Sequence, residues 1–461
     1  MRLYKFIIGI VAIGGFITLT GCDKDLNDAA INPNDPSDAS PSVLLAGAMS
    51  DLAYTHGGDF TRFTSVFTHH LDGIDRQFSD SYQEYNMAQN DFNTNWTNVY
   101  SVLTNMSRLK NKADAGGSYH YAGVARTLLA FEIMEASDVY GAMPFSDAFQ
   151  EVANLTPKFD TQEALYANCE KMLDEAIILL GKPRTTLEPG NDDFIYNGSI
   201  SKWIKFAHAL KARLYLHKSK RDASNYAKAL AEVNLSFGSA ADEARYHYPG
   251  GTGAAPMQQF ASARGDVAGG LGYANIAVTF NDTLRLRSFC NILETAVIVS
   301  GAIVPEFQDN FADSEAHPYF TSNQALPLIS FAELMFIKAE CLIKTGGSDA
   351  SVRAATKAGI DESFVYAGYS TADADAYTAQ TNVLGSFATI TVQDVITQKY
   401  LALFTEPEVF TDWRRTGFPA LTSNSTSKPI PRRFYYPQNE SDLNPNTPAA
   451  TLSDRVWWDI Q

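Results

Sequence analysis

The sequence of 461 residues is long enough for a large hydrophobic core or for two domains, and nothing in it forces a division. Its 52 acidic and 36 basic residues give a formal net charge of −16 at pH 7. Such a charge repels the phosphate backbone of nucleic acids, so the composition excludes nucleic acid as the leading partner.

The chain begins with the pattern of a secretory signal. Arg2 and Lys5 precede an uncharged, mostly apolar run over residues 6–19, which ends in small residues. A helix that spans a bilayer needs about 20 apolar residues, and this run is shorter and interrupted by glycines. It therefore predicts a signal peptide over residues 1–21 that is removed after export.

The Leu-Thr-Gly-Cys sequence that ends at Cys22 resembles a bacterial lipobox, in which the thiol is acylated and the signal is cut just before it. Cys22 is then the first mature residue and a lipidation site. One acyl chain binds a bilayer only marginally, so the several chains of a bacterial lipoprotein, palmitate among them, make a lasting anchor. The alternative is an ordinary signal peptide with a cysteine nearby by chance.

The segment after the cysteine predicts a flexible leash. Residues 27–42, "NDAAINPNDPSDASPS", are dense in Asn, Asp, Pro and Ser and bury too little apolar surface to become ordered. The folded part is expected to begin near Val43. The predicted organisation is thus a signal over 1–21, a lipidated leash over 22–42 and one domain over 43–461.

Helical periodicity dominates the rest of the chain. The segments come in pairs, and alanines on them allow close approach, which favours tetratricopeptide-like stacking of helix pairs. The predicted helices cover residues 98–112, 121–139, 165–180, 200–214, 226–233, 331–344, 352–364 and 392–404.

Three stretches lack this periodicity. Residues 238–281 are rich in Gly and Ala and are expected to be loop, and residues 72–95 are a second irregular stretch. From Gly417 onward Pro, Asn and Ser recur, which predicts an extended C-terminal wrap. Binding residues concentrate on such loops when a rigid scaffold holds them.

The cysteines do not predict a disulfide framework or a zinc site. Lipidation of Cys22 leaves Cys169, Cys290 and Cys341, an odd number at wide spacing. Cys169 falls on the apolar face of the predicted helix over 165–180, so it is expected to be a small buried hydrophobic residue rather than a reactive thiol.

Catalytic signatures are missing from the sequence. There is no phosphate-binding loop, no Gly-x-Ser-x-Gly elbow and no His-Glu-x-x-His zinc helix. His69 and His70 with Asp72 and Asp75 are residue types that bind metals. Adjacent histidines point in different directions, however, so neither a metal nor a cofactor is expected. The two catalytic carboxylates of a glycosidase have no fixed spacing in the sequence, so the missing signatures do not exclude a glycosidase.

Several motifs together carry a family resemblance. They are "DVYGAMPFSDA" at 138–148, "YNGSISKWIKFAHALKARL" at 196–214, "PLISFAELMFIKAE" at 327–340, "ITQKYLALFTEPEVFTDWRRTGFP" at 396–419, "PRRFYYPQNESDLN" at 431–444 and the final Trp-Trp-Asp at 457–459. With the lipobox, these motifs resemble the SusD/RagB family of outer-membrane lipoproteins, in its second SusD-like subgroup. The resemblance covers nearly the whole mature chain.

The resemblance implies a mostly α-helical, single globular SusD-like domain on tetratricopeptide-like helix pairs with long irregular loops. It also implies a non-enzymatic, lipid-anchored protein of the outer membrane, exposed on the cell surface. Such proteins bind oligosaccharides and act as the lid of a SusC-like TonB-dependent transporter. Peptide cargo is an alternative, and a lipid-anchored glycosidase is a third reading.

The family motifs themselves are expected to be structural. Asp412, Arg414 and Arg415 beside Trp413 suit a bidentate ion pair and a stacked guanidinium that fix the C-terminal wrap. This role is favoured over ligand contact.

Two further positions bear on buried charge and on the ligand site. Glu333 and Glu340 lie in an otherwise apolar helix, where an unpaired carboxylate is costly, so buried pairing is expected. Many family members carry an Asp-Pro-Arg turn in mid-chain, and here the corresponding region has Asp282 with Arg285 or Arg287 and no proline. The ligand class is therefore not carried over from the family.

The irregular stretch around residues 72–96 combines flat rings with Arg, Asn and Gln side chains, the groups that bind sugar faces and sugar hydroxyls. In SusD-like proteins this early loop faces the central excursion of the chain. Trp96 suits the core equally well. The predicted ligand-binding residues are Arg76, Gln77, Tyr82, Tyr85, Asn90 and Trp96, with Tyr246, Tyr248, Arg264 and Tyr273 in the second rank.

Overall fold

The computed structural model describes residues 39–289, 297–299, 302–304, 321–385 and 389–460. The predicted signal peptide, the Cys22 lipidation site, most of the leash and Cys290 lie outside these residues. The first described helix begins at Pro41.

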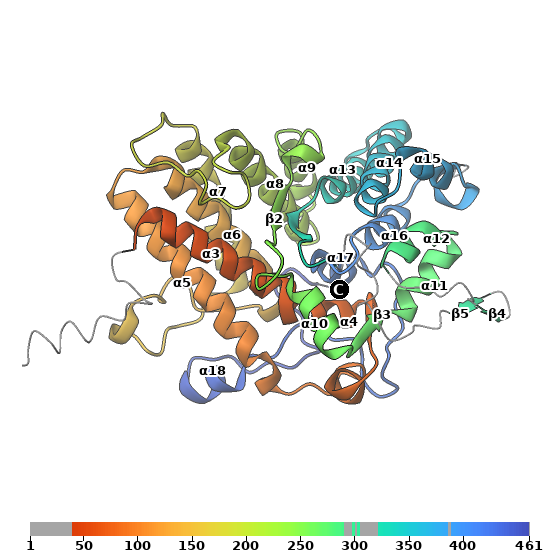
Figure 1. Cartoon of the computed structure of the whole chain (residues 1–461), viewed down its shortest axis with the longest axis horizontal. Helices are drawn as coiled ribbons and strands as arrows, with labels where there is room; N and C mark the ends of the chain where they lie inside the picture. Colours follow the sequence, from red (N-terminus) through yellow and green to blue (C-terminus); the bar gives the residue numbers. More distant parts are fainter. Residues whose placement is uncertain (1–38, 290–296, 300–301, 305–320, 386–388, 461) are drawn as a thin grey trace, which may run out of the picture.

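The described chain is mostly helical (Figure 1). The helices of its first half are α3 (Pro41–Thr55), α4 (Thr61–Phe67), α5 (Asn93–Ala115), α6 (Tyr119–Tyr140), α7 (Gln162–Leu180), α8 (Ile200–Lys218) and α9 (Asn225–Val233). Those of its second half are α10 (Pro256–Arg264), α11 (Leu271–Thr279), α12 (Thr283–Phe289), α13 (Phe331–Thr345), α14 (Asp349–Tyr366), α15 (Thr371–Thr378), α16 (Val392–Ala402), α17 (Glu408–Thr416) and α18 (Gln438–Leu443).

Side-chain caps and glycines set many of the helix ends. The Ser330 hydroxyl accepts a hydrogen bond from the Glu333 amide at 3.2 Å and starts α13. Thr391 and Asp394 form a reciprocal capping box at the start of α16. Gly346 and Gly417 end α13 and α17 with left-handed φ values of 80° and 78°, which a residue with a Cβ rarely adopts.

Successive helices pack in pairs, as the sequence predicts. Each helix from α5 to α9 contacts the next one along the chain, α9 contacts α13, and α13 contacts α14. In Figure 1, α7, α8, α9, α13 and α14 follow one another across the upper part of the molecule. Each predicted helix is present within a few residues of its predicted ends, because the apolar face that each one buries has a helical period.

Within the described residues, three short two-stranded ribbons accompany the helices. Strand β1 (Leu71–Gly73) pairs antiparallel with β3 (Val267–Gly269), so that Leu71 faces Gly269 and Gly73 faces Val267. Strand β2 (Ala244–His247) pairs with β6 (Ala325–Ile329), and β4 (Val297–Val299) with β5 (Ala302–Val304). The first of these ribbons joins the early loop to the central part of the chain.

The prediction that residues 238–281 are loop is wrong in part. This segment contains β2, α10, β3 and α11 between its turns. Pro256 stands at the start of α10, where its missing N–H is not needed, and Gly265 ends that helix with φ of 62°. The helix is short and its apolar residues do not form one face, so periodicity did not reveal it.

The C-terminal wrap is confirmed. After Gly417 the chain has no regular element among the described residues except α18. It returns to the helices and buries the Trp458 ring completely, with the indole Nε1 donating to the Asp138 carboxylate at 2.6 Å. Among the described residues, no helix is both long and apolar enough to cross a membrane.

Candidate functional site

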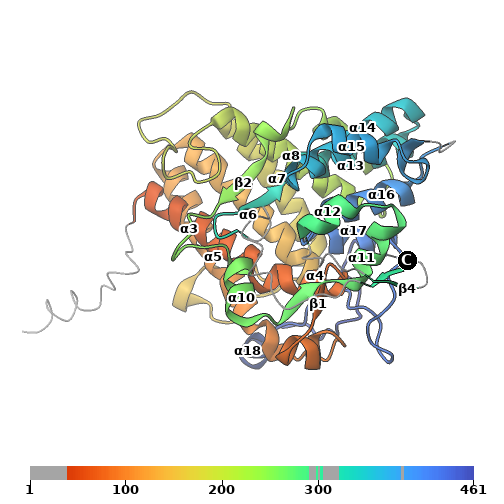
Figure 2. The same cartoon turned by 45° about the vertical axis from the view of Figure 1, so that its right-hand side comes forward.

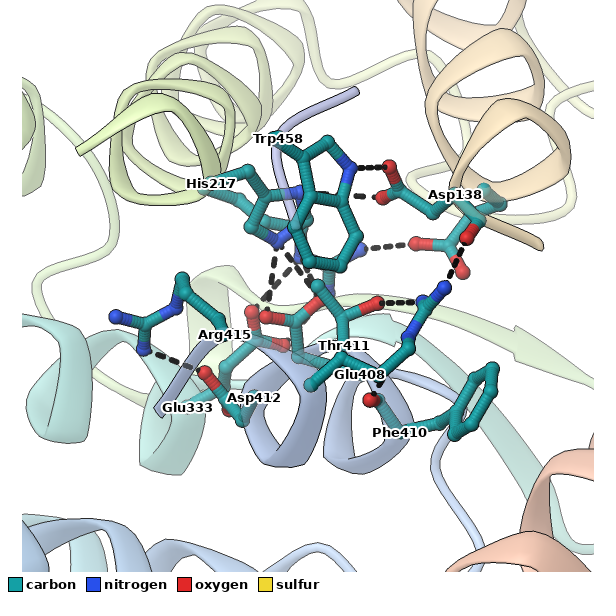
Figure 3. Close-up of polar contacts among 12 residues, drawn as sticks. Asp138, His217, Glu333, Glu408, Phe410, Thr411, Asp412, Arg415 and Trp458 are labelled. Carbon is teal, nitrogen blue, oxygen red and sulfur yellow. Dashed lines mark hydrogen bonds and ion pairs between the residues drawn. The ribbon is translucent and has the colours of Figure 1, made fainter. Parts of the chain in front are cut away.

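Charged side chains gather at the centre of the molecule, where α6, α8, α13, α16 and α17 meet the C-terminal wrap (Figure 3). No side chain of this group is more than 10% exposed. We call the group the buried charge cluster; its members are Glu135, Asp138, Arg213, His217, Glu333, Glu340, Lys399, Glu408, Asp412 and Arg415.

Every charge of the cluster has an opposite charge beside it. Arg213 lies 2.6 Å from Glu333 and 2.7 Å from Glu135. His217 lies between two carboxylates, with Nδ1 at 3.1 Å from Asp138 and Nε2 at 3.0 Å from Glu408. Figure 3 shows this imidazole held between residues of α6 and α17.

The proton affinities follow from this pairing. Burial alone would lower the pKa of His217, but the carboxylates of Glu408 and Asp138 outweigh it and raise the pKa to about 10. Burial would raise the pKa of Glu408, yet His217 and Lys399 lower it. Both partners are therefore charged at neutral pH and form an ion pair.

The cluster contains the motif residues that the sequence predicts to be structural. Arg415 pairs with Asp412 at 2.7 Å and with both oxygens of Glu340, and Glu333 pairs with Arg213, so the predicted buried pairs are confirmed. A catalytic group must touch its substrate, and these side chains are enclosed. Their ion pairs join different helices, so the role of the cluster is to hold the helices together.

The stacking partner of the motif arginine differs from the prediction. The Arg414 guanidinium lies over Phe410 at 3.9 Å and over Trp458 at 4.7 Å, measured from Cζ to the ring centroids. Trp413 instead lies under Arg432, at 5.1 Å. A helix turns by about 100° per residue, so adjacent residues such as Trp413 and Arg414 point to different sides.

Two other sequence features are placed by the structure. Asp282 pairs with Arg285 at 2.6 Å in the core, under the Phe364 ring, which selects Arg285 over Arg287. Cys169 is fully buried, and burial raises the pKa of its thiol.

The two adjacent histidines are buried. The His70 ring accepts a hydrogen bond from the Thr405 amide at 2.8 Å, and burial lowers the pKa of His70 to about 3. His69 contacts the Tyr85 hydroxyl. Within the described part of the chain, no three His, Cys, Asp or Glu side chains are grouped to hold a metal ion.

The β1–β3 ribbon brings the early loop against the end of α10 (Figure 2). Arg76 Nη1 donates to the Arg264 carbonyl at 2.7 Å and also contacts the Asp266 carboxylate. Arg264 pairs with the same carboxylate at 2.9 Å. We call this area the ribbon surface: Ile74, Asp75 and Arg76 from the loop, and residues 261–265 with the buried Asp266 from the central segment.

The ribbon surface is open and polar. A hollow of about 340 Å³ lies between Ile74, Asp75 and residues 261–265. The side chains of Arg76 and Arg264 are 51% and 49% exposed. Each guanidinium has five N–H donors, more than the shared Asp266 carboxylate can accept, so donors remain for a ligand.

Gln77 and Tyr82 lie beside this surface and share one carboxylate. The Gln77 amide donates to Asp91 at 3.0 Å, and the Tyr82 hydroxyl donates to the same oxygen at 3.1 Å. Gln77 is exposed, whereas the Tyr82 ring is 6% exposed and packs on Phe63. Asn90 is exposed in the turn that precedes α5.

The other predicted tyrosines are core residues in this structure. Tyr85 is buried with its hydroxyl near His69, and Tyr246 is buried against Tyr248. The hydroxyls of Tyr248 and Tyr273 donate to backbone carbonyls at 2.6 and 2.9 Å. Their ring faces are covered by neighbouring side chains, so of the ten predicted residues the structure gathers Arg76, Gln77, Tyr82 and Arg264.

Trp96 lies elsewhere, at one end of a groove along α5. It is 7% exposed, packs edge-on against Tyr140 and also lines the groove. Sequence reasoning missed the rest of this groove, which has a volume of about 600 Å³. The available signal was the outward face of the helix, where Tyr100, Thr104 and Ser107 follow Trp96 at helical spacing.

Comparison with known proteins adds a family and a fold. A family model named SusD-like and described as starch-binding and associating with the outer membrane matches residues 33–437. None of the curated protein sequences matches the chain.

Solved structures of low sequence identity share the fold. A SusD/RagB family protein from Bacteroides thetaiotaomicron is 23% identical, with a TM-score of 0.75, and the match covers 92% of this chain and 99% of that one. A chitin-binding SusD homologue from Flavobacterium johnsoniae is 20% identical, with a TM-score of 0.74 and coverage of 90% and 98%. A SusD homologue from Bacteroides uniformis is 22% identical, with a TM-score of 0.73 and coverage of 91% and 99%.

Proposed function

The chain belongs to the SusD-like family of outer-membrane-associated proteins, and we propose that it is a surface lipoprotein that binds a neutral oligosaccharide without cleaving it. The observation that carries this proposal is the family match over residues 33–437, since the model is described as starch-binding. The chitin-binding homologue from Flavobacterium johnsoniae, which has the same fold, supports a glycan as the ligand class.

The ribbon surface is the proposed contact area for the oligosaccharide. Arg76 and Arg264 come from segments far apart in the sequence and offer directed donors to sugar hydroxyls. Their charges are balanced by Asp75 and Asp266, and the whole chain carries −16. An anionic ligand would gain little from this surface, so a neutral one is favoured.

Membrane attachment and delivery complete the proposal. Lipidated Cys22 would hold the protein at the outer membrane, with residues 22–42 as the leash and 43–461 as the binding domain. A SusC-like TonB-dependent transporter would receive the bound oligosaccharide. Binding without catalysis fits the buried charge cluster, because its carboxylates are enclosed and paired.

Calorimetric titration of lipid-free protein, starting at Asp23, tests the ligand class. The panel contains neutral starch- and chitin-derived oligosaccharides, charged oligosaccharides and mixed peptides. We expect heat with a neutral oligosaccharide. Heat with peptides alone would contradict the proposal and show that the protein binds peptides. Release of shortened sugars would show that it is a hydrolase.

Single substitutions test the location. Arg76→Ala and Arg264→Ala should each weaken binding about tenfold, since a hydrogen bond from a charged donor contributes about 1.5 to 3 kcal/mol. The matched control is Arg184→Ala, which removes an exposed arginine away from the ribbon surface. Equal affinities of all three variants for the oligosaccharide would show that the binding site lies outside the ribbon surface.

A further inference from the structure

The groove along α5 is separate from the ribbon surface. We call it the α5 groove; one wall is the outward face of α5, and the other is the loop over residues 144–157, with Glu440 of α18 beside it. In Figure 1, α18 lies near the first turns of α5, away from α10. The volume of about 600 Å³ is within the range of about 300 to 1,000 Å³ that is typical of ligand pockets.

The wall on α5 is a single stripe of the helix. Trp96, Tyr100, Thr104, Ser107 and Asn111 follow one another at intervals of three or four residues, which places them on one face. The stripe begins with two rings, continues with two hydroxyls and ends with an amide. The opposite face of the helix packs in the core.

The two hydroxyls in the stripe have no hydrogen-bond partner in the described part of the chain. Thr104 and Ser107 are half-buried, and neither side chain makes a hydrogen bond with any described residue. Other helical hydroxyls donate to the carbonyl four residues earlier, as Thr97 does to Asn93 at 2.9 Å. Half-buried hydroxyls without an internal partner are favoured where a ligand or water supplies one.

The rings of the groove are fixed in position. The Tyr100 hydroxyl donates to the Pro144 carbonyl at 2.7 Å, and the ring packs against Trp96 and Phe149 with centroids 4.9 and 6.4 Å apart. Phe149 has φ of 61°, a left-handed conformation that costs about 1 to 2 kcal/mol for a residue with a side chain. Tyr100 and Phe149 are both half-buried, so part of each ring is open to the groove.

We propose that the α5 groove is a second binding site for a neutral oligosaccharide. The rings of Tyr100 and Phe149 pack on the C–H faces of the sugars, and the side chains of Thr104, Ser107 and Asn111 hydrogen-bond to sugar hydroxyls. The ligand class rests on the proposed function.

The charges of the lining agree with a neutral ligand. Arg108 and Glu440 are the lining residues with charged side chains, and their charges are opposite. A glycan long enough to reach both the α5 groove and the ribbon surface would bind more tightly than a fragment that fills one of them.

Steric filling of the groove tests the proposal. Ser107→Phe places a ring in the open groove, where no core residue needs to move, and Thr104→Val removes a hydroxyl at nearly constant volume. Asn98→Phe is the matched control, because Asn98 is exposed on α5 and does not line the groove. Each variant is titrated calorimetrically with the oligosaccharide fragment that binds the unmodified protein.

We expect the unmodified protein and Asn98→Phe to bind two fragments each. Ser107→Phe should bind one. Thr104→Val should still bind two, with the affinity of the groove site reduced about tenfold, which corresponds to about 1.4 kcal/mol. Arg76→Ala should leave the groove site intact.

Hydrogen exchange gives a second readout, which does not depend on the calorimetric count of bound fragments. The fragment should slow exchange of the amides in residues 144–157 in Asn98→Phe but not in Ser107→Phe. One bound fragment in all proteins, with no protection of that loop, would overturn the groove proposal while leaving the proposed function standing. An absence of glycan binding by the unmodified protein would overturn the proposed function itself.

Discussion

The buried charge cluster and the ribbon surface are both built from arginines and carboxylates, yet they differ in how exposed their charges are. In the cluster Arg213 is 3% exposed and contacts Glu135 and Glu333, each within 2.7 Å. On the ribbon surface Arg76 and Arg264 are half exposed and share the carboxylate of Asp266, and Arg76 has a second, exposed partner in Asp75 at 3.7 Å. The first arrangement fixes the fold, and the second leaves donors for a ligand.

The largest expected effect is the loss of a cluster arginine. Arg213→Met leaves the carboxylates of Glu333 and Glu135 buried without their partner, which should lower the free energy of unfolding by about 3 to 5 kcal/mol. Urea unfolding followed by circular dichroism measures it, with Arg184→Met as the control for loss of an exposed arginine. An unchanged unfolding midpoint would show that the cluster does not hold the fold together.

The next effect is a loss of stability in alkali. The pKa of His217 is raised in the folded protein to about 10 from its ordinary value of 6.5, so the folded state binds the proton more tightly. Its contribution is complete below pH 6.5 and is lost as the pH rises through 10, by an amount on the order of a few kcal/mol.

Measurements from pH 9 to 10 separate this contribution from that of two neighbouring glutamates. Burial raises the pKa of Glu135 to about 7 and that of Glu406 to about 8, so both are mostly deprotonated before this range. We expect the urea midpoint to fall over the range, and to fall less in His217→Gln, which has no imidazole to titrate. Parallel curves for the two proteins would contradict the assignment to His217.

The ribbon surface should show the opposite behaviour to the cluster. Arg76→Ala leaves Asp266 paired with Arg264 Nε at 2.9 Å, so the free energy of unfolding should change by less than about 1 kcal/mol. The same variant should weaken oligosaccharide binding about tenfold. A large loss of stability in thermal unfolding would make Arg76 a structural residue and erase the contrast between the two regions.

The smallest effect on stability is expected in the α5 groove. Thr104→Val replaces a half-buried hydroxyl that has no hydrogen-bond partner among the described residues, so the unfolding midpoint should stay within experimental error. Thr127→Val is the comparison, because the buried Thr127 hydroxyl donates to Gly123 at 3.0 Å. The groove variant should be the more stable of the two in matched thermal scans.

Local patterns were enough to predict the helices and the motif ion pairs. Helices such as α7 bury one apolar face, so their period is visible in the sequence, and a charge in an apolar helix, such as Glu333, requires a partner. The partner's identity is set by packing. Phe410 lies against Arg414 because it is one turn earlier on the same helix, and Trp458 does so because the wrap returns from distant residues.

The candidate site was only partly predictable for the same reason. Arg76 and Arg264 are brought together by the β1–β3 ribbon, whose strands of three residues each have too little pattern to be recognised. Tyrosines serve as core residues and as sugar platforms alike, and nothing in the local sequence separates the fully buried Tyr273 from the half-buried Tyr100.

The most direct test of the account is one titration series with product analysis. Lipid-free protein is titrated with neutral starch- and chitin-derived oligosaccharides, and the mixture is then analysed for shortened sugars. The account predicts binding of a neutral oligosaccharide, weakened by Arg76→Ala and unaffected by Arg184→Ala, with the sugar recovered intact. Binding of only charged glycans or peptides, or recovery of cleaved sugar, would contradict it.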